Sequence, residues 1–142
     1  MIHTEPNWKS YMVETTEPIF TPEQCKIISK LGRSMPPQNA QVGGGKGGEY
    51  NTKTRISHIS WIPFDQPDSI QMYKKLEDVM HKTNRRHFGF QDMAINEQAQ
   101  YTEYPEGGFY DWHMDIDLVM KKEPPVRKIS MTLVLSHESE FE

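Results

Sequence analysis

The chain has 142 residues, 35% of them hydrophobic, and a formal net charge of -4, which is the composition of an ordinary globular protein. A chain of this length fits one domain with a sizeable core, so we expect residues 1–142 to form a single domain. The negative charge argues against a general nucleic-acid binder. No apolar run approaches the roughly 18 residues that a membrane span needs.

The N-terminus and the cysteine content bear on the cellular compartment. The sequence begins Met1-Ile2-His3-Thr4-Glu5-Pro6, which has neither the basic nor the apolar region of a secretory signal. Cys25 is the single cysteine, so an intrachain disulfide cannot form, and this is typical of a reducing compartment. We therefore predict a cytoplasmic protein that does not use a membrane as a partner.

Two helices are predicted in the first part of the chain. Thr21 is a good N-cap, Pro22 suits the first helical position, and Gln24 completes a capping box. Gly32 is a natural stop for this helix. A second helix is predicted to start at Pro67-Asp68-Ser69 and to end by Gly89. Its apolar positions recur at helical spacing and are expected to face the core: Met72, Leu76, Val79, Met80 and Thr83.

The segment between these helices contains a glycine-rich run and a predicted strand. A phosphate-binding loop needs Lys followed by Ser or Thr, but Gly47 follows Lys46 in the run 43–48. We therefore interpret this run as a flexible loop, of the kind that covers a site. The residues from Arg55 to Ile62 are rich in Ile and include Trp, which predicts a strand.

Strands are predicted from Ala94 onward. The candidates are 96–104, then 109–119 after a turn at 105–108, and 127–136, in which apolar and polar residues alternate. Helices followed by consecutive antiparallel strands predict an α+β fold, with the helices supporting a sheet or barrel.

His113 and Asp115 carry the clearest chemical signal. On a strand, residues i and i+2 point the same way, so an imidazole and a carboxylate could bind one ion. These are two thirds of the 2-His-1-carboxylate triad of non-haem Fe(II) sites. A bare His-x-Asp also arises by chance among surface polar residues. Asp111 and Asp117 share the strand parity of the pair, and they are either solvated or tune the site from outside it.

The surrounding residues resemble a known family. Tyr104, Gly107-Gly108, Tyr110, His113 and Asp115 resemble the pattern of prolyl 4-hydroxylase-like dioxygenases (PKHD-type hydroxylases), which depend on Fe(II) and 2-oxoglutarate. The strand 127–136, followed by Glu138 and Glu140-Phe141-Glu142, is similar to the segment that follows in that family. Arg55-Ile56-Ser57 resembles an Arg-x-Ser motif that lines the peptide groove of prolyl hydroxylases.

The resemblance implies a double-stranded β-helix, or jelly roll, with supporting N-terminal helices. It implies Fe(II) and 2-oxoglutarate as cofactors, optionally ascorbate, and dioxygen and a peptide or protein as partners. The implied reaction couples decarboxylation of 2-oxoglutarate to hydroxylation of a peptidyl side chain, with prolyl as the leading candidate. His113 and Asp115 would bind the metal, with no further catalytic residue, and Tyr104 would contact 2-oxoglutarate. The implied substrate-binding residues are Arg55, Ser57, Tyr110 and Trp112.

The sequence departs from the family in one respect. The family has a second metal-binding His several strands beyond His-x-Asp, followed by a Lys or Arg that pairs with 2-oxoglutarate. His137 lies where the family has a loop, so we interpret it as an exposed loop residue. We therefore expect a partial domain, incomplete at its C-terminus or completed by a partner chain. An open sheet edge would favour a homodimer.

Other functions remain open at this point. One is a catalytically incomplete jelly-roll fragment that serves as a binding or interaction module. Another is a different metal enzyme on a cupin-like barrel, such as an isomerase or hydrolase. A third is a small-molecule oxygenase of the same superfamily. The identity of the third metal ligand discriminates between the metal enzymes, and turnover of 2-oxoglutarate discriminates between enzyme and binding module.

Overall fold

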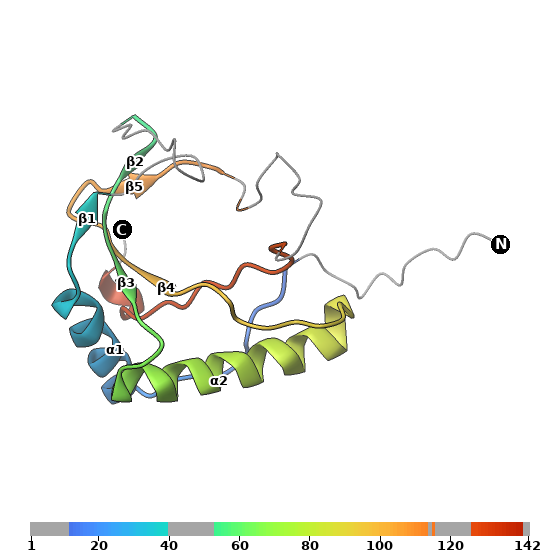
Figure 1. The fold of residues 1–142 in the computed structure, drawn as a ribbon. Helices are drawn as coiled ribbons and strands as arrows, with labels where there is room; N and C mark the ends of the chain where they lie inside the picture. Colours follow the sequence, from blue (N-terminus) through green and yellow to red (C-terminus); the bar gives the residue numbers. More distant parts are fainter. Residues whose placement is uncertain (1–11, 40–52, 114, 116–125, 141–142) are drawn as a thin grey trace.

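The computed structural model describes residues 12–39, 53–113, 115 and 126–140. These residues form a mixed α+β structure in which helices pack on small antiparallel sheets (Figure 1). The helices are α1 (Pro22–Ser34), α2 (Pro67–Thr83), the π-helix η1 (Asn84–Phe88) and the 3-10 helix η2 (Glu138–Glu140). The strands are β1 (Gln38–Asn39), β2 (Arg55–Ile56), β3 (His58–Ile62), β4 (Ala99–Glu103) and β5 (Phe109–Tyr110). The glycine-rich run 43–48 lies outside the described residues.

The start of α1 is as predicted, and its end is not. The Thr21 hydroxyl accepts a hydrogen bond from the Gln24 amide at 3.3 Å, and the Gln24 side chain accepts one from the Thr21 amide at 3.0 Å, so the capping box forms. The helix continues past Gly32 to Ser34, so the predicted stop at Gly32 is wrong. The glycine is explained by packing, because a Cβ at Gly32 would lie 2.2 Å from the ring of Tyr101.

The second helix lies close to its prediction. α2 begins at Pro67, and η1 extends it until Gly89 ends the helical region with φ 73, a left-handed conformation that glycine adopts without strain. The Gly89 amide donates to the carbonyl of Asn84 at 2.7 Å. The buried face of α2 includes Met72, Leu76 and Met80, as its helical spacing indicated, together with Ser69 and Tyr73.

The predicted strand from Arg55 to Ile62 is divided at Ser57 between two sheets. β2 pairs antiparallel with β5, whereas β3 lies between β1 and β4 in a three-stranded antiparallel sheet. The predicted strand 96–104 is the shorter β4. Because β2 and β3 are adjacent in sequence, the β2–β5 pair is held at one end of the larger sheet, on the side away from α2 (Figure 1).

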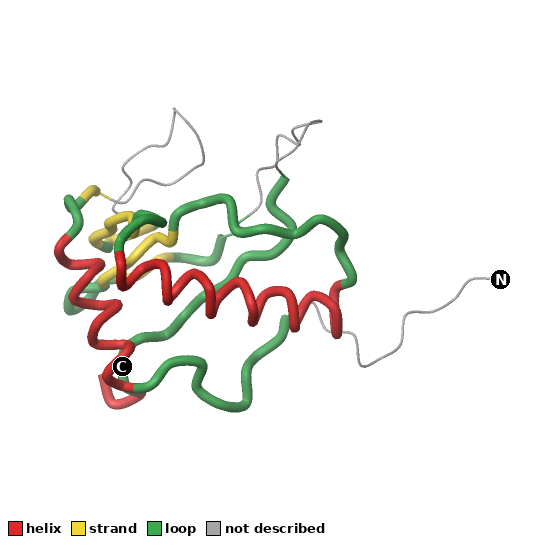
Figure 2. The backbone as a smooth tube through the Cα atoms, turned by 60° about the horizontal axis from the view of Figure 1, so that its bottom comes forward, coloured by secondary structure: helices red, strands yellow, loops and turns green. Residues whose placement is uncertain are grey.

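The core lies between the helices and the β3–β4 pair. The turned view shows the two helices in front of the strands (Figure 2). The buried cluster consists of Phe20, Ile28, Ile62, Met72, Tyr73, Leu76 and Tyr101, and Cys25 packs against it. The Tyr73 hydroxyl donates to the carbonyl of Ile62 and accepts from the amide of Ala99, both at 2.6 Å. Tyr73 thereby joins α2 to both strands, and burial raises the pKa of its phenol.

Two strand predictions near the C-terminus are wrong: 109–119 in extent, and 127–136 altogether. Of the predicted strand 109–119, the described part is a strand only in β5, and residues 116–119 lie outside the described range. Residues 126–135 have no strand assignment, because their backbone forms no sheet ladder with any described segment. The alternation of 127–136 survives in the packing, since Leu133 and Leu135 are half-buried against the core.

The α+β prediction is confirmed at the level of class. The described sheets are small and antiparallel, and they do not close into a barrel within the part of the chain that the structure covers. No helix among the described residues is long and apolar enough to cross a membrane.

Candidate metal site

The candidate site is built on the β2–β5 pair. The turn before β5 is closed by the Gly108 amide, which donates to the carbonyl of Pro105 at 2.6 Å. Gly107 has φ 69, which suits glycine at this position of a turn. A Cβ on Gly108 would lie 2.9 Å from the carbonyl oxygen of Ile56, so only glycine allows this close approach of the two strands. The predicted turn 105–108 is therefore confirmed, and it aligns β5 with β2.

The strand pairing brings together three of the residues expected to bind substrate. Arg55 lies opposite Tyr110 in the register of β2 and β5. The Arg55 guanidinium carbon lies 4.4 Å from the centre of the Tyr110 ring, a cation–π contact. The Arg55 Nε donates to the Ser57 hydroxyl at 2.7 Å. Arg55 and Ser57 are both buried, with 5% and 8% exposure.

The chain leaves the strand directly after Tyr110. The Asp111 amide still donates to the carbonyl of Thr54 at 2.9 Å, and the Asp111 carboxylate accepts from the amide of Trp112 at 2.8 Å, where the backbone bends. The rings of Tyr110 and His113 then stack, with centres 3.6 Å apart and planes 14° apart. Residues three apart on a regular strand point to opposite faces, so the strand parity that we predicted for this segment is wrong.

His113 and Asp115 nevertheless meet. His113 Nε2 lies 3.3 Å from Asp115 Oδ1, with the two side chains 36% and 48% exposed. The other ring nitrogen, Nδ1, lies 2.8 Å from the backbone carbonyl oxygen of Asp111. A carbonyl oxygen can only accept, so this contact places a proton on Nδ1. In the neutral imidazole the lone pair is then on Nε2, facing the carboxylate.

Two residues that the sequence did not single out as site residues bond to Asp115, and a third, Glu97, holds one of them. The Ser130 hydroxyl donates to Asp115 Oδ2 at 2.5 Å. Arg127 donates to the backbone carbonyl of Asp115 at 2.9 Å and pairs with Glu97 at 2.6 Å. Ser130 lies on the polar face of the alternating segment 127–136, which is the only signal that could have suggested it. Nothing in the spacing of Glu97 or Arg127 indicates this contact.

Other residues of interest lie apart from this cluster. Tyr104 and Trp112 are 51% and 100% exposed, and neither side chain forms a hydrogen bond or ring contact with another described residue. His137 is exposed, as predicted, and its bonds run to Ser139 and Glu140 within its own turn. Asp117 lies outside the described residues. Among the residues that the structure describes, no group of three or more His, Cys, Asp or Glu side chains could hold a metal ion.

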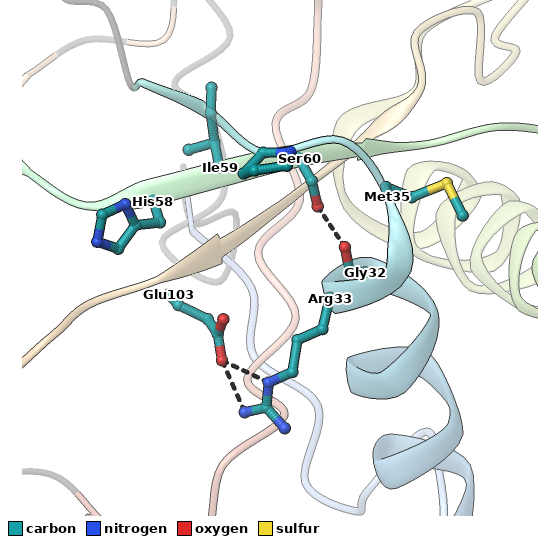
Figure 3. Close-up of a pocket in the computed structure, with 8 residues that line it drawn as sticks. Gly32, Arg33, Met35, His58, Ile59, Ser60 and Glu103 are labelled. Carbon is teal, nitrogen blue, oxygen red and sulfur yellow. Dashed lines mark hydrogen bonds and ion pairs between the residues drawn. The ribbon is translucent and has the colours of Figure 1, made fainter.

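A separate hollow lies at the end of α1 (Figure 3). Its volume is about 90 Å³, and its lining includes His58, Ser60 and Glu103. Glu103 accepts from Arg33 Nε at 2.7 Å and from Nη2 at 2.6 Å, and Ser60 donates to the carbonyl of Gly32 at 2.6 Å. The hydrogen bond from Arg33 holds the pKa of the Glu103 carboxyl below its ordinary value. These polar groups bind one another, so the hollow is a weaker candidate than the His113–Asp115 pair.

The chain was also compared with known proteins. No protein-family model matches it, and no match was found among the curated proteins or the solved structures.

Proposed function

We propose that this chain belongs to an Fe(II)- and 2-oxoglutarate-dependent oxygenase that hydroxylates a peptidyl side chain, with prolyl as the leading candidate, on a jelly-roll fold. The observation that carries the proposal is the pair formed by His113 Nε2 and Asp115 Oδ1, 3.3 Å apart. The resemblance of residues 104–115 to the prolyl 4-hydroxylase-like pattern supplies the reaction class.

The two donor atoms fit a shared metal ion. Ligand atoms held about 2.1 Å from one ion and at right angles lie about 3 Å apart, which is close to the observed separation. Metal-bound histidines usually donate their other ring N–H to a carbonyl or carboxylate, and His113 Nδ1 faces the Asp111 carbonyl in this way. Without a cation or a second proton on the ring, two acceptor atoms would face each other.

The surrounding residues of the chain orient these donors. Tyr110 stacks on the His113 ring and fixes its plane. The Ser130 hydroxyl donates a hydrogen bond to Oδ2 of Asp115, and the other carboxylate oxygen, Oδ1, faces His113. When bound, Fe(II) with 2-oxoglutarate and dioxygen supplies the oxidising power to place a hydroxyl group on an unactivated C–H bond.

The exposed aromatic residues suit an extended substrate. Trp112 lies between Asp111 and His113 in the chain and is fully exposed, so its indole is available to a peptide that approaches the pair. Tyr104 is half-exposed on the far side of the 105–108 turn, and we propose its hydroxyl as a contact for 2-oxoglutarate. Arg55 and Ser57, held beside Tyr110, are the proposed peptide-binding residues.

The proposal is tested by incubating the chain with Fe(II), 2-oxoglutarate, ascorbate and proline-rich peptides in air. Succinate formation and the gain of one oxygen atom by the peptide are measured by mass spectrometry. We expect both products, and we expect H113A and D115A to remove them. H137A is the matched control, because that histidine is exposed and bonded within its own turn, and it should retain activity.

Two results would contradict this function. A folded chain that forms neither succinate nor hydroxylated peptide would favour the binding-module alternative. Equal losses in H137A and H113A would mean that His113 has no special role as a ligand.

A further inference from the structure

Among the residues that the structure describes, Arg55 is the one buried guanidinium near the candidate site. Arg55 lies on β2 and is 5% exposed, and its Nε donates a hydrogen bond to the Ser57 hydroxyl at 2.7 Å. Burial of a charged group is unfavourable unless the charge is paired and hydrogen-bonded. The contact with the Tyr110 ring offsets part of this cost, but a ring is a weaker partner than a carboxylate.

The described part of the chain gives Arg55 no carboxylate. The arginine and lysine ion pairs between described side chains join Arg33 to Glu103, Lys82 to Asp78 and Arg127 to Glu97. The exposed arginines Arg33 and Arg127 thus have acidic partners, whereas the buried Arg55 has a hydroxyl and a ring. A guanidinium fixed through Nε still presents its two terminal nitrogens in the fork that matches a carboxylate.

The position of this fork relates it to the candidate metal site. His113 stacks on Tyr110 with ring centres 3.6 Å apart, and the Arg55 guanidinium lies 4.4 Å from the centre of the same ring. One face of a ring cannot hold two groups at these distances, so Arg55 and His113 occupy opposite faces of Tyr110. The guanidinium therefore lies one ring away from the imidazole.

We propose that Arg55, held in place by Ser57 and Tyr110, is a carboxylate-binding site beside the His113–Asp115 pair. The carboxylate comes either from a small dicarboxylate such as 2-oxoglutarate or from an acidic side chain on the peptide substrate. The contacts of Arg55 give the location of the site. The choice of 2-oxoglutarate and of an acidic peptide side chain as carboxylate sources rests on the proposed function.

The site is tested by NMR titration of the metal-free chain, following the Arg55 Nε–H signal. The probes are succinate, 2-oxoglutarate, a proline peptide that contains Glu, and the same peptide with Gln in place of Glu. We expect a saturable shift with at least one carboxylate probe. R55K keeps the charge but loses the fork, so it should weaken that binding about tenfold or more.

R33K is the matched control, since Arg33 is already paired with Glu103, and its affinity for the probes should equal that of the native chain. If R55K does not fold, S57A replaces it, because loss of the Nε acceptor should weaken binding about threefold. Binding of succinate and 2-oxoglutarate assigns the site to a small dicarboxylate. Preference for the Glu peptide over the Gln peptide, lost in R55K, assigns it to an acidic substrate residue.

The inference is overturned by a folded chain in which no probe shifts the Arg55 signal, or by equal losses in R33K and R55K. These outcomes are separable from those for the proposed function, because the titration contains no metal. Carboxylate binding without hydroxylation would leave Arg55 assigned and remove the oxygenase. Hydroxylation with unchanged KM values in R55K would support the oxygenase and remove the assignment of Arg55 as a carboxylate-binding residue.

Discussion

Two regions of the molecule are held together in different ways. The helix–sheet core, made of α1, α2, β3 and β4, rests on buried apolar side chains such as Ile62, which is 2% exposed. The candidate metal site, made of β2, β5, residues 111–113, Asp115 and residues 127–130, rests on polar and ring contacts, and its metal-binding pair is exposed. His113 and Asp115 are 36% and 48% exposed. The difference indicates that stability belongs to the core, whereas the site depends on a few directed hydrogen bonds.

The largest expected effect is on the stability of the core. I62A removes a fully buried side chain between α2 and β4 and should lower the free energy of unfolding by about 2–5 kcal/mol, measured by urea denaturation. I56A is the matched control within the site region. Ile56 is 37% exposed, so its truncation should cost about 1 kcal/mol or less. Equal losses in the two variants would contradict the division into two regions.

The second prediction concerns the site alone. H113A should lower the affinity for Fe(II) at least about 100-fold, a change of roughly 2.7 kcal/mol, measured by anaerobic equilibrium dialysis. The same variant should unfold within about 0.5 kcal/mol of the native chain, because exposed side chains contribute little to stability. A large loss of stability with unchanged metal affinity would mean that His113 is a structural residue.

The third prediction concerns Tyr73, a residue of the core. Y73F removes a hydroxyl that donates to the carbonyl of Ile62 and accepts from the amide of Ala99. The two backbone groups lose their partner, so we expect a loss of about 1–3 kcal/mol in the free energy of unfolding. Fe(II) affinity should stay unchanged. Y110F is the control, because the Tyr110 hydroxyl has no recorded partner among the described residues, and it should be close to neutral.

The smallest prediction is a pH dependence. Arg33 lowers the pKa of the Glu103 carboxyl from its ordinary value of 4.5. Because the folded-state pKa is lowered, the stabilisation is fully present above the ordinary value of 4.5 and is lost as the pH falls through the folded-state pKa. The pair is largely exposed, so the loss should be about 0.2–1 kcal/mol. Stability measured below pH 4.5 should decline less in E103Q than in the native chain, and a parallel decline would contradict the pairing.

The sequence predicted the elements whose signals are local. Thr21, Pro22 and Gln24 define the start of α1, and Gly89 ends the second helical region, because capping depends on neighbouring residues. Gly32 was misinterpreted for the opposite reason: its role is to admit the Tyr101 ring, which is distant in sequence. Packing of this kind leaves no periodic pattern.

The candidate site also combines a feature that a local sequence signal predicted with contacts between residues distant in sequence. The His-x-Asp spacing predicted that His113 and Asp115 lie together, which the structure shows, although the chain bends at Trp112 instead of continuing as a strand. The contacts of Ser130 and Arg127 with Asp115 could not be predicted, since they depend on how a distant segment crosses the site.

The most direct test of the central claim is an anaerobic titration of Fe(II) and 2-oxoglutarate into the chain, followed by visible absorption. We predict a saturable charge-transfer band from the iron–2-oxoglutarate chelate, present in the native chain and in H137A and absent in H113A. A folded native chain without this band, or an equal band in H113A, would contradict the assignment of His113 and Asp115 as the metal-binding pair.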